Sequence, residues 1–298
     1  MERTQLGTYV NGNTIVAMYS DGTKERYVKD GEVPAPEFPE SMDLKITNCC
    51  DLGCAMCAEC STPNGMHAEL NNTLLETIRP FTELAIGGGN PLSHPGLDNF
   101  LAEMHGRNVI CNITVNARHF LRYQERIKSL YKSNLIRGLG VSIPTDEYIS
   151  DELLNAIKKF PNAVVHTIYG VTPMSVYKKL ADNNLNVLIL GFKPKGNGKS
   201  YEDNNFSEVS LNKAQLYESL KDMMPRFKAI AFDNLAVEQL TLRSILSNDA
   251  FDRLYMGDDG EFTMYIDLVR MKYGKSSTHP MRDIDATSVA ELFQSLKQ

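Results

Sequence analysis

Short apolar segments alternate with helical stretches over most of the chain, beginning near residue 41. The strand-like segments lie near residues 43–48, 83–87, 109–116, 136–143, 163–169 and 187–192, and helical patterns occupy the intervals between them. Six strands that alternate with helices are typical of βα units, which build a parallel sheet. The pattern therefore predicts an α/β fold with its core in this part of the chain.

The first forty residues follow a different pattern, in which strand-like segments are separated by tight turns. These segments cover residues 8–10, 14–20 and 24–29, and turn-forming pairs stand at 11–12, 21–22 and 30–31. The pairs are Asn-Gly or Asp-Gly, which favour β-hairpins because these residues tolerate positive φ angles. A proline-rich link at 33–40 follows, so we expect a β-meander over residues 1–40.

The chain after residue 192 mixes helices and strands. We predict a loop at 193–205, helices near 211–223 and 236–246, a strand at 228–233, and a hairpin formed by 252–256 and 261–269. In the last strand Tyr265 and Asp267 are expected to face solvent. The whole pattern divides the chain into the meander at 1–40, the core at 41–235, and an α+β extension at 236–298 that covers the core.

The composition is that of an ordinary globular protein. Of the 298 residues, 42% are hydrophobic and 23% are charged. The chain opens without an apolar signal segment, and no apolar run approaches the roughly 18 residues of a membrane span. We therefore expect a cytoplasmic protein without membrane contact. The net charge of −6 gives no basic footprint for a nucleic-acid backbone, which argues against a nucleic-acid partner.

Five of the six cysteines lie between residues 49 and 60, within the sequence NCCDLGCAMCAECS. Thiols remain reduced in the cytoplasm, so a metal site explains this cluster better than disulfides do. A structural zinc site normally needs two separated ligand pairs. Cys54 and Cys57 have no distant partner pair, and only His67 offers a further ligand nearby.

Two kinds of iron–sulfur cluster fit the cysteine spacing. A closed cluster would use four thiolates, namely Cys54, Cys57 and Cys60 with Cys50 or Cys49. An open cluster would use the C-x-x-x-C-x-x-C set of Cys50, Cys54 and Cys57, on a loop directly after the first core strand. Three thiolates around a four-iron cube leave one iron with an open position, which permits chemistry on a bound molecule.

The open arrangement resembles that of radical S-adenosylmethionine (radical SAM) enzymes. The resemblance covers approximately residues 41–233 and implies a partial (βα)6 barrel with its cluster on the loop after the first strand. Cys50, Cys54 and Cys57 would then bind a [4Fe-4S] cluster, and the remaining iron would bind S-adenosylmethionine (SAM). Cys49 and Cys60 are additional thiols without an assigned role.

A glycine motif at the end of the second core strand extends the resemblance. Radical SAM enzymes have Gly-Gly-Glu-Pro there, and this chain has Gly88-Gly89-Asn90-Pro91. Glycines allow the backbone to approach a ligand closely, so the carbonyls of Gly88 and Gly89 are expected to receive the SAM ammonium. Asn90 departs from the family's glutamate, because it removes a charge but keeps an acceptor oxygen.

Later strands supply the remaining SAM contacts that the resemblance implies. The period-two alternation of a strand places Asn112, Thr114 and Asn116 on one face, and Cys111 on the other as a buried apolar residue. In the fourth strand the glycines at 138 and 140 share a face with Ser142 and would leave room for a cofactor. The expected contacts outside the glycine motif are Met56, Asn116, Ser142, Leu190 and Gly191.

The resemblance implies an enzyme that cleaves SAM reductively to a 5′-deoxyadenosyl radical, which abstracts hydrogen from a substrate. A flavodoxin or a ferredoxin is the implied electron donor. The substrate is not identified, and a peptide or protein is slightly preferred to a small molecule because the meander offers an edge for an added strand. The alternative function is a non-catalytic electron carrier or redox sensor with a four-cysteine closed cluster.

The other polar candidates receive ordinary structural interpretations. No histidine is nominated as catalytic, and His119 is expected at the surface, as are those at 105 and 279. Lys193 and Lys195 are expected in a solvated basic loop; the alternative is that they place positive charge near the barrel mouth, for the SAM carboxylate or an anionic substrate. The Gly-Lys-Ser triplet at 198–200 lacks the preceding glycine of a phosphate-binding loop.

Overall fold

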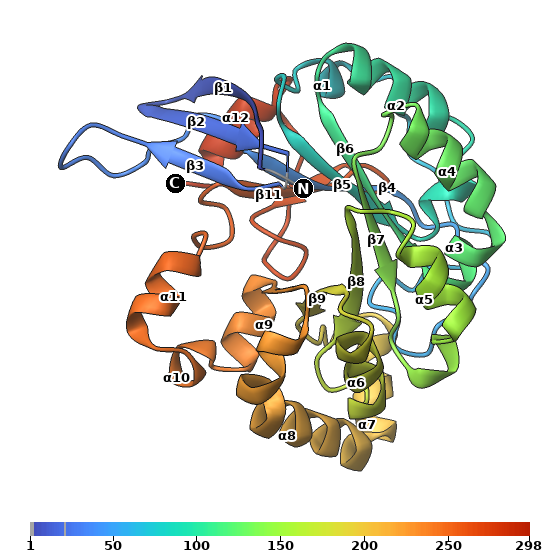
Figure 1. Cartoon of the computed structure of the whole chain (residues 1–298). Helices are drawn as coiled ribbons and strands as arrows, with labels where there is room; N and C mark the ends of the chain where they lie inside the picture. The colour runs from blue at the N-terminus through green and yellow to red at the C-terminus, as the bar shows by residue number, and fades with distance from the viewer. Residues whose placement is uncertain (1–2, 21) are drawn as a thin grey trace.

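The computed structural model describes residues 3–20 and 22–298 (Figure 1). Its larger sheet contains the six strands predicted for the core: β4 (Ser41–Thr47), β5 (Glu83–Gly88), β6 (Ile110–Asn116), β7 (Gly138–Ser142), β8 (Ala163–Ile168) and β9 (Asn186–Leu190). These strands neighbour one another in chain order, and every adjacent pair is parallel. The predicted parallel core is therefore confirmed.

Four further strands extend this sheet at its two edges. The strand predicted at 228–233 is present as β10 (Ala229–Phe232), which pairs in parallel with β9. Beyond β4 the order continues with β11 (Thr263–Asp267), β12 (Lys272–Gly274) and β13 (Arg282–Asp283). The C-terminal part of the chain thus shares hydrogen bonds with the first core strand.

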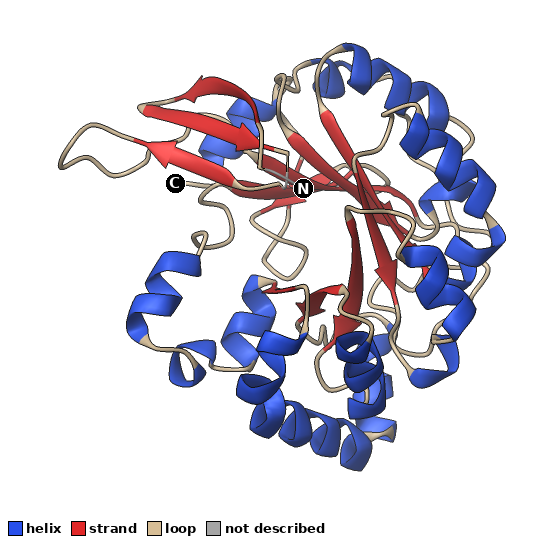
Figure 2. Cartoon of the chain, in the orientation of Figure 1, coloured by secondary structure: helices blue, strands red, loops and turns tan. Residues whose placement is uncertain are grey.

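Helices lie along the outer side of the curved sheet (Figure 2). In chain order they are α1 (Thr73–Glu76), α2 (Leu97–Gly106), α3 (Ala117–Arg122), α4 (Gln124–Lys132), α5 (Asp151–Ile157), α6 (Met174–Asp182), α7 (Asn197–Asn204) and α8 (Phe206–Met223), with 3-10 turns η1 (Pro91–Ser93), η2 (Asp146–Tyr148) and η3 (Met224–Arg226). The predicted alternation in β6 is confirmed, since Cys111, Ile113 and Val115 are buried in the core. The polar residues between them are half-buried on the inner side.

Three predictions after residue 192 are wrong. The segment expected as a loop contains α7. The helix expected at 236–246 is divided into α9 (Asn234–Gln239) and α10 (Leu242–Ile245), because Thr241 between them adopts a left-handed conformation with φ of 50°. The first strand of the expected hairpin is instead helix α11 (Asn248–Leu254), which Ser247 caps and in which Phe251 stacks on Tyr255.

The second strand of the expected hairpin exists as β11, but it has other partners. It runs parallel to β4, so that Tyr265 pairs with Asp43, and antiparallel to β12, so that Tyr265 also pairs with Gly274. The last helix, α12 (Val289–Ser295), follows β13. The sequence pattern identified the strand correctly and its partner wrongly, because pairing depends on contacts that are distant in sequence.

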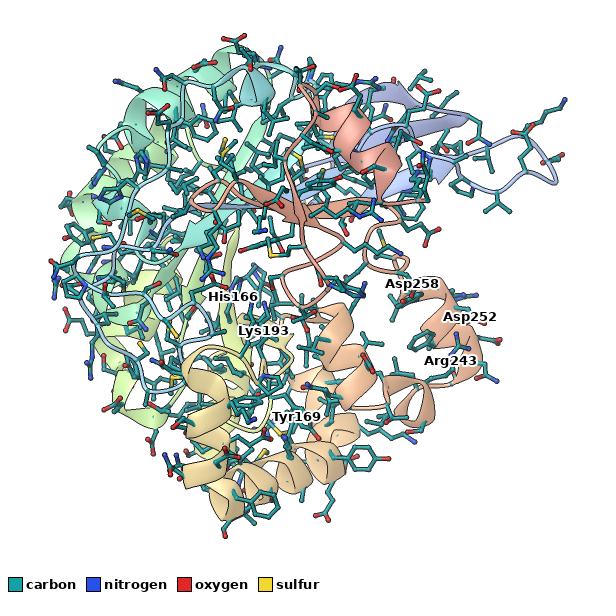
Figure 3. All side chains as sticks on the ribbon, turned by 180° about the vertical axis from the view of Figure 1, so that it is seen from behind. His166, Tyr169, Lys193, Arg243, Asp252 and Asp258 are labelled. Atoms are coloured by element: carbon teal, nitrogen blue, oxygen red, sulfur yellow. The ribbon has the colours of Figure 1, made fainter. Side chains whose placement is uncertain are left out.

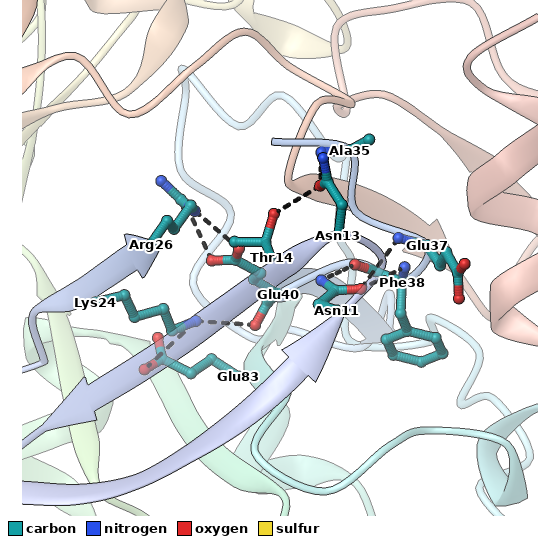
Figure 4. Close-up of polar contacts among 10 residues, drawn as sticks. All are labelled: Asn11, Asn13, Thr14, Lys24, Arg26, Ala35, Glu37, Phe38, Glu40 and Glu83. Atoms are coloured by element: carbon teal, nitrogen blue, oxygen red, sulfur yellow. Dashed lines mark hydrogen bonds and ion pairs between the residues drawn. The ribbon is translucent and has the colours of Figure 1, made fainter. Parts of the chain in front are cut away.

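The N-terminal meander is confirmed as a three-stranded antiparallel sheet of β1 (Gln5–Asn11), β2 (Thr14–Tyr19) and β3 (Lys24–Tyr27). The link at 33–40 packs back on it through Asn11, whose Oδ1 accepts hydrogen bonds from the Glu37 and Phe38 amides (Figure 4). Asp21, which belongs to one predicted turn, lies outside the described residues. The three-part division at residues 40 and 235 stays a prediction.

In the described part of the chain, every helix is too short or too polar to cross a bilayer.

Candidate functional site

The cysteine-rich loop begins directly after β4, as predicted, and backbone hydrogen bonds hold it in place. The amide of Cys50 donates to the Thr62 carbonyl oxygen (2.9 Å), and that of Asn48 donates to Met66 (2.8 Å). At Gly65 an added Cβ would lie 2.1 Å from the Asn48 carbonyl oxygen, so only glycine permits this approach. The loop is therefore a folded element and not a free connection.

Cys50, Cys54 and Cys57 are half-buried on this loop. Burial raises the pKa of Cys50, and the thiols of Cys54 and Cys57 raise it further. The pKa of Cys54 is raised by burial and by Cys57, while the Tyr148 hydroxyl, 3.9 Å from its sulfur, opposes the shift. Thiols that resist ionisation without a counter-charge would be stabilised as thiolates by a bound metal.

The spacing of these three sulfurs does not match a mononuclear zinc site. Within the described residues, the one trio of possible ligand atoms lying within 4.8 Å of each other is Cys50, Asp51 and His119. At least two of the three sulfurs therefore lie more than 4.8 Å apart, farther than the about 3.8 Å between sulfurs that share one tetrahedral zinc with bonds of about 2.3 Å. His67, the nearby candidate ligand, contacts the Thr47 hydroxyl through Nδ1 (2.9 Å). A multinuclear cluster suits this wider set better.

Cys49 and Cys60 have other neighbours than this trio. The Cys49 sulfur donates to the Pro63 carbonyl oxygen (3.3 Å), and the exposed Cys60 sulfur contacts Oδ1 of Asn197 at 3.2 Å. Neither thiol contributes to the raised pKa of Cys50 or Cys54. Each of the two extra cysteines is thus engaged with a neutral acceptor.

The glycine motif packs directly against the cysteine loop. The Gly89 amide donates to Thr47, and the Asn90 amide donates to Cys49, each at 2.7 Å. A Cβ on Gly88 would lie 2.3 Å from the Thr47 carbonyl oxygen, and a Cβ on Gly89 would lie 2.4 Å from that of Cys49. These contacts explain why glycine stands at both positions.

The side chain of Asn90 has a structural role. It is 3% exposed, and its Oδ1 accepts a hydrogen bond from the Leu92 amide (3.2 Å) at the start of η1. A buried acceptor that caps a 3-10 turn is already satisfied within the chain. The expected contact between this oxygen and SAM stays a prediction.

The other predicted SAM contacts lie in different surroundings. Asn116 and Ser142 face each other at the ends of β6 and β7, where Asn116 also caps α3 by accepting from the Arg118 amide. Leu190 lines the interior of the barrel. Gly191 is buried and donates to Asp233, and Met56 is half-buried on the cysteine loop.

A cavity of about 1440 Å³ occupies the inner side of the sheet. Inward residues of the parallel strands line it, and His166 and Lys193 are visible beside it in Figure 3. Burial lowers the pKa of His166 to about 4, so its ring is neutral at pH 7. Volumes of this order exceed the typical several hundred Å³ of a pocket for one small ligand.

The space beside the glycines of β7, which we expected to hold a cofactor, is occupied by side chains. A Cβ on Gly140 would lie 2.5 Å from Cε1 of His166, and a Cβ on Gly138 would lie 2.5 Å from Oδ1 of Asn112. The space that the glycines leave is therefore taken by side chains of neighbouring strands. His166 gains its position inside the barrel because Gly140 has no side chain.

Several polar residues that we expected at the surface are buried. Tyr265 lines the cavity at 7% exposure, and Asp267 is 1% exposed beside Lys45, to which its carboxylate lies at 3.0 Å. His119 is also 1% exposed, and its Nε2 contacts the Asp51 carboxylate at 2.6 Å. Lys193 lines the cavity as well. The polar surroundings of these side chains come from segments remote in sequence.

Lys45 connects the cysteine loop to strand β11 through its side chain. It forms ion pairs with Glu59, on the cysteine loop, and with Asp267 of β11. Lys195 lies 3.4 Å from the same Glu59 carboxylate. Burial raises the pKa of Glu59, but hydrogen bonds and charges from Lys45 and Lys195 outweigh it and hold the pKa below its usual value. Two cations and two carboxylates thus balance in this network.

Comparisons with known proteins agree with the geometry. Solved structures of SuiB from Streptococcus suis have the same fold: the structure bound to S-adenosylmethionine has a TM-score of 0.55 at 17% identity and covers 83% of this chain and 64% of SuiB. SuiB bound to the precursor peptide SuiA has the same TM-score at 15% identity, over 89% of this chain and 66% of SuiB. No protein-family model matches the chain.

Sequence comparison points the same way. GTP 3′,8-cyclase of Helicobacter pylori strain HPAG1 is 27% identical over 137 residues, and that of strain 26695 is 26% identical over 138. Each match covers 43% of this chain and only 40% of the relative. In its fold and in the matched segment, the chain therefore resembles radical SAM enzymes, which use a [4Fe-4S] cluster and SAM.

The cysteine trio lies on the loop after β4, where the resemblance to radical SAM enzymes predicts the cluster. The chemistry of the donor set fits such a cluster, since the three thiols are half-buried, near one another and free of disulfides. Sequence reasoning missed the interior residues His166 and Asp43. Their signal was period-two alternation, which places Asp43 in register with Ala85 on the inner side of the sheet.

Proposed function

We propose that the protein is a radical SAM enzyme that acts on a peptide or protein. The observation that carries this proposal is the separation of the cysteines into a half-buried trio on the loop after β4, Cys50, Cys54 and Cys57, and two thiols engaged elsewhere. When bound, the cluster and SAM supply a 5′-deoxyadenosyl radical that abstracts hydrogen from the substrate. The trio holds the cluster, which leaves one iron for SAM.

The chain's own residues bind and enclose the reactants. The carbonyl groups of Gly88 and Gly89 are offered to the SAM ammonium, and Asn116 and Ser142 stand side by side at the ends of β6 and β7. Apolar walls such as Leu190 exclude water from the interior, which protects a radical from reaction with solvent. His166 remains neutral and adds a polar group without a charge.

Two features favour a peptide or protein substrate over a small molecule. The cavity is larger than one small ligand requires, and β1 and β3 are edge strands of the meander, to which an extended segment could add a strand. SuiB has been solved with a precursor peptide. A flavodoxin or ferredoxin would supply the electron, in the cytoplasm, where thiols remain reduced.

Cysteine substitution tests the proposal against a closed, four-cysteine cluster of an electron carrier or redox sensor. After anaerobic reconstitution with iron and sulfide, wild type should hold about four irons per chain. Cys50→Ala, Cys54→Ala and Cys57→Ala should each lose most of this iron, whereas the matched controls Cys49→Ala and Cys60→Ala should retain it. Loss of iron in Cys60→Ala equal to that in Cys50→Ala would support the closed cluster instead.

A further inference from the structure

Asp43 projects into the cavity from the first core strand. It pairs in register with Ala85 of β5 on one side and with Tyr265 of β11 on the other. All three side chains line the cavity. Because Ala85 is small, the carboxylate is open to the cavity on that side. The side chain is exposed to this cavity, although it lies deep within the protein.

The other carboxylates near Asp43 are satisfied by the fold. Asp233 caps α9, and its Oδ1 accepts hydrogen bonds from the amides of Gly191 (2.8 Å) and Ala236 (2.7 Å). Asp259 accepts a hydrogen bond from Asn234 (2.8 Å). Among the described residues, no hydrogen bond or ion pair reaches Asp43. Of these three carboxylates, Asp43 is therefore the one whose oxygens remain available to a ligand.

The nearby cations are also engaged. Lys193 is the positive charge that acts on Asp43, but its ammonium donates to the Ser277 hydroxyl at 2.8 Å. Lys45 is held between Glu59 and Asp267. At the start of β7, Arg137 donates to the Tyr19 carbonyl oxygen at 2.6 Å. Each of these groups would have to leave its partner to bind Asp43.

The electrostatics of this position favour a positively charged ligand. Burial raises the pKa of Asp43; Lys193 opposes this, and the carboxylates of Asp233 and Asp259 raise it further. A carboxylate that faces a cavity without a partner in the protein can form a charge-assisted hydrogen bond with a cationic group. The charged groups that act on Asp43 are thus two carboxylates and one lysine.

We propose that Asp43 binds a cationic group of the substrate, an ammonium or a guanidinium, inside the cavity. This inference rests on the proposed function, since it assumes that the cavity holds the substrate. A lysine side chain, an arginine side chain or the free amino terminus of a peptide carries the required group. Asp43 would fix the position of that group while the remainder of the peptide occupies the cavity.

The test uses small probes of matched size with the reconstituted protein: n-butylammonium and agmatine as cations, butanamide as the neutral control and butyrate as the anion. Binding is followed through the side-chain carboxyl carbon of Asp43 by NMR, with the resonance assigned by its absence in Asp43→Asn. We expect saturable shifts with the two cations, and affinities about tenfold higher than for butanamide. Asp203→Asn, which changes an exposed carboxylate on α7, should bind like wild type.

The outcomes separate this inference from the proposed function. Equal responses to the cations and to butanamide, a preference for butyrate, or no saturable shift would overturn the role of Asp43. When Asp43→Asn fails to fold, Asp43→Ser supplies the assignment, and the comparison of probes in wild type then decides. SAM cleavage is assayed separately in wild type. Cation binding without SAM cleavage would refute the proposed function and leave the cation site intact.

Discussion

The junction between the meander and the barrel contrasts with the barrel interior, although both are rich in charged groups. At the junction the Arg26 guanidinium donates two hydrogen bonds of 2.8 Å to the Glu40 carboxylate, and Lys24 donates to the Glu40 carbonyl oxygen at 3.0 Å (Figure 4). In the interior, Asp43 and His166 have no such partners among the described residues. Polar groups that stabilise the fold are paired, whereas those that await a ligand are not.

This difference predicts opposite effects of substitution in the two regions. Removing a partner at the junction leaves a buried charge uncompensated and lowers stability. Removing an unpaired charge from the interior relieves an existing cost and raises stability, at the expense of ligand binding. The four predictions below sharpen or break this contrast, and they run from the largest expected effect to the smallest.

Arg26→Ala should lower the free energy of unfolding by about 3 kcal/mol, because it leaves the Glu40 carboxylate, 2% exposed, without its cation. Urea denaturation measures this change. The control is Arg226→Ala, which removes an exposed ion pair to Asp182 and should cost less than about 1 kcal/mol. Equal effects of the two substitutions would show that the junction pair is not a structural element.

Gly140→Ala should lower stability by about 2 kcal/mol, since its Cβ would lie 2.5 Å from the His166 ring and 2.8 Å from the Thr114 hydroxyl. The matched control is Gly87→Ala, on the neighbouring part of the same inner surface, where an added Cβ meets nothing within 4 Å. Thermal and urea unfolding compare the two. If both variants are equally stable, His166 does not depend on the space beside Gly140.

His166 should make wild type lose stability as the pH falls from 7 to 5. Its pKa is about 4 in the fold and about 6.5 in the unfolded chain, so between these values the unfolded state binds more protons. Protonation then favours unfolding, and the loss continues until the pH passes below 4. We expect about 1 kcal/mol between pH 7 and 5, because the ring faces an open cavity.

The measurement for His166 is a pair of urea denaturation curves at each pH, for wild type and for His166→Gln. The variant should lack this part of the pH dependence. An unchanged slope of stability against pH in the variant would assign the dependence to other titrating groups.

Asp43→Asn should stabilise the protein slightly at pH 7, by less than about 0.5 kcal/mol, because solvent in the cavity screens the exposed carboxylate. The pKa of Asp43 is raised in the fold, so its ionised form costs stability above the unfolded pKa. The gain should therefore disappear as the pH falls toward 4, where the wild-type carboxyl becomes neutral. Destabilisation at pH 7 would mean that Asp43 has a structural partner and would contradict the contrast.

The sequence was sufficient for those features that repeat locally. Strands β4 to β9 follow from apolar runs of strand length, and the inner and outer faces of β6 follow from alternation. The cysteine loop was found because Cys50, Cys54 and Cys57 lie within eight residues. These patterns can be recognised in the sequence without knowledge of tertiary contacts.

The features that the sequence did not reveal depend on residues far apart in the chain. Lys45 and Asp267 are separated by more than two hundred positions, and only the parallel pairing of β4 with β11 brings them to 3.0 Å. Tyr265 was assigned to solvent for the same reason. His119 was assigned to the surface because its partner, Asp51, lies on a different element.

The central claim is tested most directly by SAM cleavage. The protein is reconstituted anaerobically with iron and sulfide and reduced with dithionite in the presence of SAM, and 5′-deoxyadenosine is quantified by mass spectrometry, with Cys50→Ala as the control. We predict release of 5′-deoxyadenosine by wild type and none by the variant. Absence of release from wild-type protein that holds four irons per chain, with a peptide bearing a cationic side chain present, would contradict the account.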